Sequence, residues 1–282
     1  MTFSTFISAD ELCAHLNDPD WVIIDCRFDL SNPSWGREDY LRSHIPGAVF
    51  ADIELDLSRP VTPDSGRHPL PDPDTLAKKF GQWGIGPDTQ VVAYDSQSGS
   101  YAARLWYLLR LCGHTRVSIL EGDFNLWLQE GYPQRSCGEH STAREFTGTF
   151  DQRKLISAGE LLRLIGSDQP YQLVDSRAPQ RYRGEIEPID RVAGHIPGAV
   201  NRFHGENLTP EGRLKPAEQL RAEFLALLDG FSPEQAVFYC GSGVTACFNL
   251  AAMEAAGLPG ANLYPGGWSE WIQDPERPIQ RG

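Results

Sequence analysis

The chain repeats itself, and this repeat constrains the fold more than any other feature of the sequence. Three motifs of the first half recur in the second half in the same order. The pairs are VIIDCR (22–27) and QLVDSR (172–177), SHIPGAVF (43–50) and GHIPGAVN (194–201), and GDFNLW (122–127) and GGWSEW (266–271). A repeat of this length indicates two homologous domains. We expect these domains at residues 1–138 and 150–282, joined by a polar linker at 139–149.

Each half alternates short apolar runs with segments of helical spacing. The runs with strand length and β-branched content are 22–25, 91–94, 117–120, 171–175, 236–239 and 262–264. The segments with helical spacing are 75–84, 102–113, 216–228 and 244–257. Strands that alternate with helices indicate a parallel sheet covered on both faces. We therefore predict an α/β protein with two small parallel sheets, each with helices on both faces.

Composition and charge restrict the class of partner. The chain is 40% hydrophobic and 10% aromatic, as in a globular enzyme, and its formal net charge is -13. Nucleic acids and anionic membrane surfaces require basic patches, and no such patch is visible. A small anionic substrate remains possible, because backbone N–H groups and one or two arginines can create a local positive field.

Targeting signals and metal-binding patterns are not visible. The N-terminal residues lack the basic and apolar regions of a signal peptide, and no segment approaches the roughly 20 apolar residues of a membrane span. We therefore expect a cytoplasmic protein. None of the six cysteines forms a Cys-x-x-Cys pair, so reduced thiols are expected rather than disulfides or a zinc site.

Cys240 stands between the apolar run 236–239 and a Gly-Ser-Gly turn that leads into a predicted helix. In parallel sheets, ligands bind beyond the carboxyl ends of the strands. N–H groups of such a loop would converge on the sulfur and stabilise a thiolate and any anion attached to it. A helix dipole supplies only about 0.3 to 1 kcal/mol, and one pKa unit corresponds to about 1.36 kcal/mol. Loop hydrogen bonds or a cation are therefore needed as well.

The loop allows two other interpretations. The first is a tight strand-to-helix turn without chemistry, which the repeat disfavours. The second is a cysteine phosphatase, in which an arginine six residues after the cysteine binds phosphate. The sixth residue here is Ala246, so the bidentate partner of a phosphate dianion is absent from that position.

The two repeated α/β domains, HIPGA in each half, and the run CGSGVT from Cys240 to Thr245 resemble the tandem-domain rhodanese family of sulfurtransferases. The CGSGVT loop is most similar to the 3-mercaptopyruvate branch, whereas the thiosulfate branch usually carries basic residues after the cysteine. The resemblance implies that Cys240 takes a sulfur atom as a persulfide and passes it to cyanide or a thiol, and a thiol reductant protein is one such acceptor. It implies substrate contacts from the loop residues Gly241, Gly243, Val244 and Thr245, and it implies neither a metal nor an organic cofactor.

The same resemblance implies further substrate contacts. Arg181, in an Arg-Tyr-x-Gly motif, matches the arginine that faces the loop and binds the donor's carboxylate or sulfonate. Arg183 is expected at the surface. Mercaptopyruvate enzymes often have a second arginine shortly before GHIPG, and here only Arg191 is available, at a shifted position. It could bind substrate or pair with Asp190 or Glu187.

A Ser-His-Asp group is implied as well, formed by Ser242 with His68 and Asp52 of the first domain. The chemistry fits, because breaking the C–S bond creates an enolate that needs a proton, and histidine titrates near neutral pH. Asp95 occupies the position of Cys240 in the first half, which is therefore expected to be inert and to wall a cleft between the domains.

Duplicated residues favour structural roles, because catalysis is expected in one domain only. His44 and His195 are expected to hold backbone groups. Cys247 is expected to pack against the sheet, although a role as resolving thiol stays open. Besides the mercaptopyruvate enzyme, two functions therefore remain: a thiosulfate sulfurtransferase, and a non-catalytic carrier of persulfide sulfur.

Overall fold

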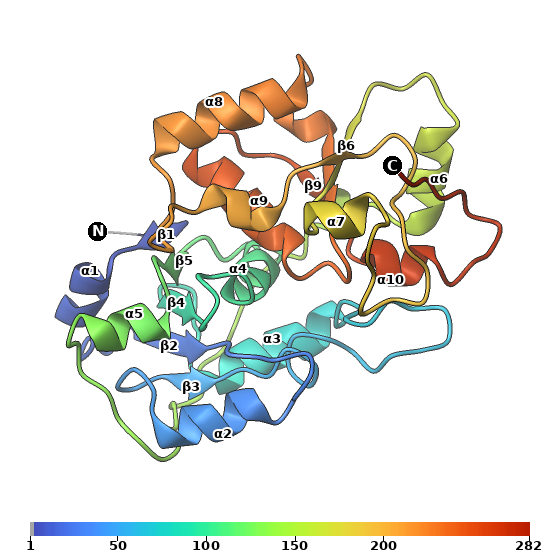
Figure 1. Cartoon of the computed structure of the whole chain (residues 1–282). Coiled ribbons are helices and arrows are strands. Elements are labelled where there is room, and N and C mark those ends of the chain that lie inside the picture. Colours follow the sequence, from blue (N-terminus) through green and yellow to red (C-terminus); the bar gives the residue numbers. More distant parts are fainter. Residues whose placement is uncertain (1–2) are drawn as a thin grey trace. The chain divides into compact units, whose positions relative to one another are not determined.

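The computed structural model describes residues 3–282, which form two compact units (Figure 1). Unit 1 contains the described chain up to Arg59, together with Pro71–Asp151 and the short segment Pro210–Leu214. Unit 2 contains Gln152–Thr209 and Lys215–Gly282, together with the segment Pro60–Leu70. Each unit therefore includes a short segment that belongs, in chain order, to the other half of the sequence.

Unit 1 is built around a parallel sheet of five strands. Its strands are β1 (Phe6–Ile7), β2 (Trp21–Asp25), β3 (Val49–Phe50), β4 (Gln90–Tyr94) and β5 (Val117–Leu120), and its helices are α1 (Ala9–Ala14), α2 (Trp35–Arg42), α3 (Pro73–Gln82), α4 (Ala102–Leu111) and α5 (Phe124–Gln129). The strand order β1-β5-β4-β2-β3 can be followed in Figure 1. All pairings are parallel, so the chain crosses back through a helix or loop to the end of the sheet where the next strand begins.

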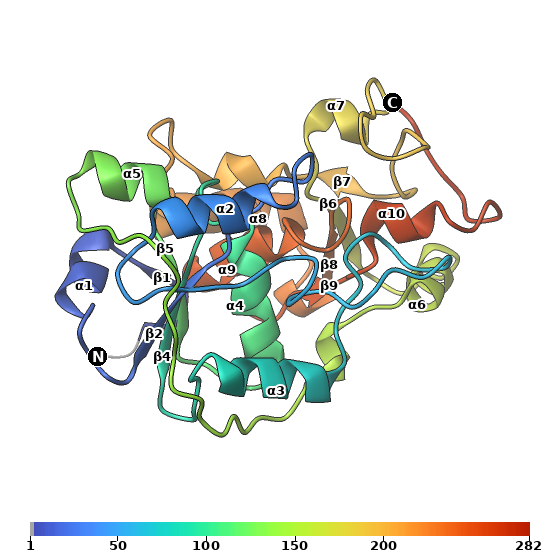
Figure 2. The ribbon, with the colours of Figure 1, turned by 90° about the horizontal axis from the view of Figure 1, so that it is seen from below.

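Helices cover both faces of the first sheet. Val92 of β4 packs in one cluster with Leu12 of α1 and Trp127 of α5. Val91 points to the opposite face, because side chains alternate along a strand, and it is buried as well. That second face contacts α4. Figure 2 shows α1 and α5 on one side of the strands and α4 on the other.

Unit 2 repeats the plan with four strands. Its strands are β6 (Gln172–Asp175), β7 (Val200–Asn201), β8 (Ala236–Tyr239) and β9 (Asn262–Leu263); its α-helices are α6 (Ala158–Ile165), α7 (Pro179–Tyr182), α8 (Ala217–Leu228), α9 (Ala246–Ala255) and α10 (Gly267–Trp271); and its 3-10 helices are Gln152–Lys154, His204–Asn207 and Pro233–Gln235. The order is β7-β6-β8-β9, again with parallel pairs. A single parallel bridge between Leu155 and Leu263 stands where β1 pairs with β5 in unit 1.

The second sheet is also covered on both faces. Val237 and Tyr239 pack with Leu161 of α6 and Trp271 of α10. Phe238 points the other way and meets Phe224 of α8 edge-on, with ring centroids 6.5 Å apart. The fold class predicted from the sequence is therefore confirmed, including helices on both faces of each sheet.

The histidine of each HIPGA motif makes the same kind of contacts in both units. His44 exchanges backbone hydrogen bonds with Arg135, and His195 does so with Gln280. The ring Nδ1 of each histidine lies 2.7 or 2.8 Å from a backbone carbonyl, that of Tyr40 or Tyr182. These contacts are the structural role expected for a duplicated histidine.

The long, strongly patterned elements match their predicted places, and so does the short strand β9 within the predicted run 262–264, whereas the other short strands were not predicted. The two-residue strands β1, β3 and β7 carry too few residues for a pattern to be read. No helix within residues 3–282 is both long and apolar enough to cross a membrane.

Candidate active site

Cys240 follows β8 directly and begins the loop that leads to α9. It is only 2% exposed. The N–H of Trp268 donates to the carbonyl oxygen of Cys240, and the N–H of Ser269 donates to that of Gly241, both at 2.8 Å. The loop is thus held by the first turn of α10.

Two glycines let the backbone approach this closely. Gly243 has φ 72°, and a Cβ there would come 2.2 Å from the carbonyl oxygen of Pro265. Gly267 has φ 60°, and a Cβ there would come 2.6 Å from the carbonyl oxygen of Cys240. A side chain at either position would meet both backbone strain and a backbone clash.

The loop presents N–H donors near the cysteine. Within residues 3–282, the backbone N–H groups of Gly241, Ser242 and Val244 donate to no protein oxygen. All three residues are buried. Buried backbone donors normally have partners, so this loop is suited to hold an anion.

Cys247 lies on the first turn of α9 and is fully buried. Its Sγ is 3.3 Å from the carbonyl oxygen of Gly243, and its N–H donates to the carbonyl oxygen of Val244. These contacts tie the loop to the helix and fit the packing role expected for this thiol.

Ser242 and His68 form a buried pair inside unit 2. The His68 Nδ1 lies 2.8 Å from the Ser242 Oγ, and the two residues are 4% and 6% exposed. His68 belongs to the segment Pro60–Leu70, which is part of unit 2 although it precedes most of the first repeat's helices in the sequence. The structure therefore brings together two of the residues implied for the Ser-His-Asp group.

Arg181 faces the cysteine loop. A Cβ on Gly241 would lie 3.8 Å from both Nη atoms of Arg181. The Arg181 Nε and Nη2 donate to the carboxylate of Glu187 at 2.7 to 3.1 Å, and Nη2 also donates to Asp190 at 3.1 Å. Burial alone would raise the pKa of Glu187, but its bonds from Arg181 and from the N–H groups of Asp190 and Ile189 hold it below its usual value.

Arg67 is the site residue that the sequence analysis missed. Its Nη2 lies 2.8 Å from the point where a Cβ on Gly241 would sit, and its Nη1 pairs with Asp190. The only signal in the sequence is its position directly before His68. That signal becomes informative only when the segment Pro60–Leu70 is known to belong to unit 2.

Three other charged residues considered in the sequence, Arg191, Arg183 and Asp52, have partners outside the cysteine loop. The Arg191 Nη2 donates to the carbonyl oxygen of Ile272 at 2.7 Å, whereas Glu187 and Asp190 both pair with Arg181. Arg183 is exposed and pairs with Glu185 at 2.7 Å. Asp52 lies in unit 1, where its Oδ1 accepts from the N–H groups of the next loop residues, Glu54 and Leu55.

Val244 and Thr245 complete the loop. Val244 is buried, and Thr245 is partly exposed at the N-terminal end of α9. The Thr245 side chain makes no capping hydrogen bond to the helix.

The Asp95 carboxylate in unit 1 is surrounded by backbone N–H groups. Its carboxylate accepts four N–H bonds, from Gln97, Gly99, Tyr101 and Ala102, at 2.7 to 2.9 Å. Burial raises the pKa of Asp95 above its ordinary value, against the lowering effect of these four bonds. The loop after β4 thus binds an anion of its own chain at the position that corresponds to Cys240.

The repeated Asp and Arg of the first strand motifs form buried ion pairs in both units. Asp25 and Arg27 are 2.7 Å apart, and Asp175 and Arg177 are 2.6 Å apart. Burial alone would lower the pKa of Arg177, but the adjacent Asp175 carboxylate raises it. These pairs occur in both halves and account for the conserved spacing within the repeat without catalysis.

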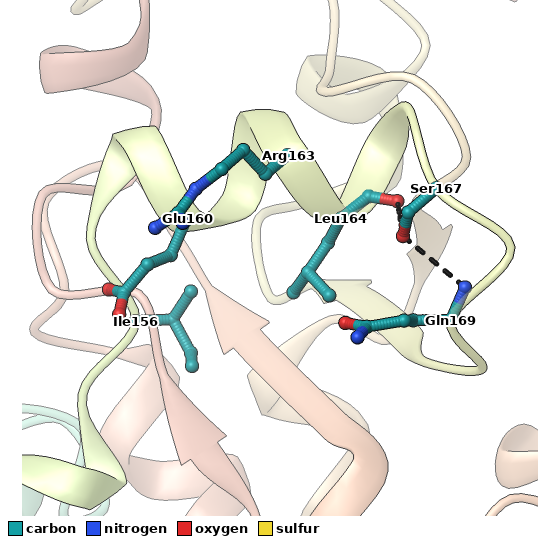
Figure 3. A pocket seen from close by; sticks show the side chains of 6 residues that line it. All are labelled: Ile156, Glu160, Arg163, Leu164, Ser167 and Gln169. Atoms are coloured by element: carbon teal, nitrogen blue, oxygen red, sulfur yellow. Dashed lines mark hydrogen bonds between the residues drawn. The ribbon is translucent and has the colours of Figure 1, made fainter.

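No group of three or more His, Cys, Asp or Glu within the described chain is arranged to hold a metal ion. A surface cavity of about 430 Å³ lies along α6, and none of the site residues predicted from the sequence lines it (Figure 3). At one end of this cavity the N–H of Gln169 donates to the Ser167 Oγ at 3.3 Å.

Comparisons with known proteins agree with the repeat and the fold. Residues 8–130 and 157–274 both match the rhodanese-like domain. The chain is 47% identical, over the full length of both chains, to a probable 3-mercaptopyruvate sulfurtransferase of Pseudomonas aeruginosa. It is 37% identical to a putative thiosulfate sulfurtransferase of Mycobacterium tuberculosis, over 98% of this chain and 96% of that one.

A solved structure gives the same result. The crystal structure of the 3-mercaptopyruvate sulfurtransferase of Escherichia coli superimposes with a TM-score of 0.79 at 33% identity, covering 95% of this chain and 100% of that one. The resemblance predicted from the motifs is confirmed: this chain belongs to the rhodanese family, with two tandem rhodanese-like domains.

Proposed function

We propose that this chain is a sulfurtransferase in which Cys240 takes a sulfur atom from 3-mercaptopyruvate and passes it to a thiol or to cyanide. The observation that carries the choice of donor is the Ser242 hydroxyl bonded to His68 beside the cysteine. This pair can move a proton to an enolate, which forms from mercaptopyruvate and not from thiosulfate. Full-length relatedness to a probable mercaptopyruvate enzyme supports the same donor.

In the first half-reaction, the Cys240 thiolate attacks the sulfur of mercaptopyruvate. The S–S bond forms as the C–S bond breaks, and the bonding electrons leave as the enolate of pyruvate. A proton from the Ser242–His68 pair converts this enolate to pyruvate, and the S–H of the transferred sulfur returns a proton to the pair. Cys240 is left as a persulfide anion. Arg181 binds the donor's carboxylate, and the N–H groups of Gly241, Ser242 and Val244 hold the charge on sulfur. Substrate contacts from Gly243 and Thr245 stay predictions.

In the second half-reaction, an acceptor thiolate attacks the outer sulfur of the persulfide. The S–S bond breaks and its electrons return to the Cys240 thiolate, while the acceptor becomes a persulfide. Cyanide becomes thiocyanate by the same step. No oxidant or reductant is consumed in the transfer, and neither a metal nor an organic cofactor takes part.

Several further assignments stay predictions. They are the contribution of Asp52 to the proton relay, a substrate contact from Arg191, the domain boundaries 1–138 and 150–282 with the linker 139–149, a thiol reductant protein as acceptor, and the cytoplasm as compartment.

Mass spectrometry and product analysis test the proposal together. Wild-type protein exposed to mercaptopyruvate should gain one sulfur atom on the peptide that contains Cys240 and release an equal amount of pyruvate. Cys240→Ser should do neither, whereas Cys247→Ser should retain both if it folds. Pyruvate release by Cys240→Ser at the wild-type rate would refute the proposed mechanism.

Thiosulfate is the second donor to be measured, because a guanidinium pair near the loop also suits its sulfonate group. A higher kcat/KM for thiosulfate than for mercaptopyruvate, with thiocyanate as product, would reassign the donor. Persulfide formation without turnover on either donor would instead identify a sulfur carrier.

A further inference from the structure

Two guanidinium groups from distant parts of the chain converge beside Cys240. The Arg67 Nη2 lies 2.8 Å, and both Arg181 Nη atoms lie 3.8 Å, from the point where a Cβ on Gly241 would sit. All these residues belong to unit 2. Because residue 241 is glycine, it carries no side chain that would displace the Arg67 guanidinium from this position.

Contacts on both sides of Arg67 fix its position. A Cβ on Gly66 would come 2.4 Å from the carbonyl oxygen of Gly266, so the segment lies directly against the loop that holds Cys240. The Arg67 N–H donates to the Ser269 Oγ at 3.1 Å, and the next residue, His68, binds Ser242. Arg67 is therefore anchored at its backbone rather than placed by a flexible surface loop.

Asp190 holds the two arginines together. One carboxylate oxygen pairs with the Arg67 Nη1 and the other with the Arg181 Nη2, at 3.1 Å in the second case. Its side chain is only 4% exposed, so the bridging carboxylate is shielded from water. The bridge offsets the repulsion between like charges and leaves the Arg67 Nη2 turned toward Gly241.

We propose that Arg67 is a substrate-binding residue that, together with Arg181, binds the carboxylate of the sulfur donor. Two guanidinium groups on one carboxylate allow each oxygen to accept a charge-assisted hydrogen bond. The donor's sulfur would then lie over Cys240, which adjoins Gly241. The arginine available shortly before GHIPG, Arg191, donates to the carbonyl oxygen of Ile272. Arg67 therefore supplies the second guanidinium group for the donor's carboxylate.

The inference rests on the proposed function, and the test separates the two. Steady-state rates of Arg67→Ala and Arg67→Lys are measured with mercaptopyruvate and with mercaptoacetone, which has a methyl group in place of the carboxylate. Arg67→Ala should lower kcat/KM for mercaptopyruvate about 10- to 100-fold, mainly through KM, and leave mercaptoacetone unchanged. Arg67→Lys should lose less, because it keeps the charge but not the planar fork. Arg183→Ala, which removes an exposed arginine of the same unit, is the matched control and should change neither rate.

A binding measurement makes the result independent of turnover. Calorimetry gives the Kd of mercaptopyruvate for Cys240→Ser with and without Arg67→Ala, and the added change should weaken binding by the same factor as kcat/KM. An equal loss of kcat/KM for mercaptopyruvate and mercaptoacetone in Arg67→Ala would identify a structural role and overturn the inference. An unchanged Kd for mercaptopyruvate would overturn it as well. If the wild type used only thiosulfate, the proposed function would fail. If, in addition, Arg67→Ala impaired only that reaction, the anion bound would be a sulfonate and the carboxylate assignment would be wrong.

Discussion

The His68 Nδ1 lies 2.8 Å from the Ser242 Oγ, although 174 positions separate the two residues. Both side chains are buried, and both belong to unit 2. A buried hydroxyl next to an imidazole can exchange a proton without bulk water, as the proposed release of pyruvate requires. The pair is therefore the feature that most directly connects the fold to the proposed chemistry.

His68 and Ser242 should act as one unit in catalysis. His68→Asn and Ser242→Ala should each lower kcat with mercaptopyruvate about 100- to 10,000-fold, because each change breaks the same proton path. The double variant should be no slower than the more impaired single variant. Single-turnover release of pyruvate measures the effect, with exposed His140→Asn as the control. Additive losses would show that the two side chains work independently.

The glycines of the cysteine loop should differ in their tolerance of a methyl group. Gly243→Ala should destabilise the protein by about 2 to 4 kcal/mol, because its φ is 72° and its Cβ would clash with the Pro265 carbonyl oxygen. The atoms nearest to a methyl group in Gly241→Ala belong to arginine side chains, which can move, so this variant should fold and instead raise KM for mercaptopyruvate. Urea unfolding and steady-state kinetics measure the two effects. The expectation fails if Gly241→Ala is the less stable variant.

Asp95 should contribute strongly to the stability of the chain. Asp95→Ala removes the acceptor of four backbone N–H groups in a buried loop, and we expect a loss of about 2 to 4 kcal/mol in the free energy of unfolding. Asp72→Ala is the matched comparison and should cost less, because that exposed carboxylate caps α3 through one N–H and the hydroxyl of Thr75. Denaturant unfolding of both variants decides the matter. Equal costs would mean that the four bonds add nothing to the stability of the fold.

Glu223 should make stability depend on acid pH. Burial alone would raise its pKa, but hydrogen bonds from Lys215, Arg202 and Gln219 lower it to about 2. Because the folded-state pKa lies below the unfolded value, the carboxylate stabilises the fold above about pH 4.5, and this contribution is lost as the pH falls toward 2. Glu223→Gln should therefore cost about 1 to 2 kcal/mol at pH 7, after allowance for solvent screening.

The pH dependence of that loss is the sharper measurement. The difference in unfolding free energy between wild type and Glu223→Gln should shrink as the pH is lowered from 5 to about 2. Exposed Glu276→Gln is the control and should show little difference at either pH. A cost for Glu223→Gln that stays constant down to pH 2 would show that the ion pairs with Lys215 and Arg202 do not stabilise the fold.

Repetition and pattern made most of the architecture predictable. The two copies of HIPGA and of the strand motifs fix the number of domains, and runs such as 91–94 and 236–239 are apolar enough to be buried strands. Cys240 could be selected because a strand, a flexible turn and a helix follow one another directly in the sequence. The short strands β1, β3 and β7 could not be predicted, because pairing with neighbours rather than local pattern creates them.

The sequence by itself determined the repeated α/β fold and the reactive thiol, since both follow from residues that are neighbours in the chain. Tertiary structure decided which charged groups surround that thiol. It placed Arg67 rather than Arg191 beside Gly241, and it paired Asp190 with two arginines at once. The physical reason is that hydrogen bonds depend on distances between atoms, and the distance between Arg67 and Gly241 is set only when the segment Pro60–Leu70 packs into unit 2.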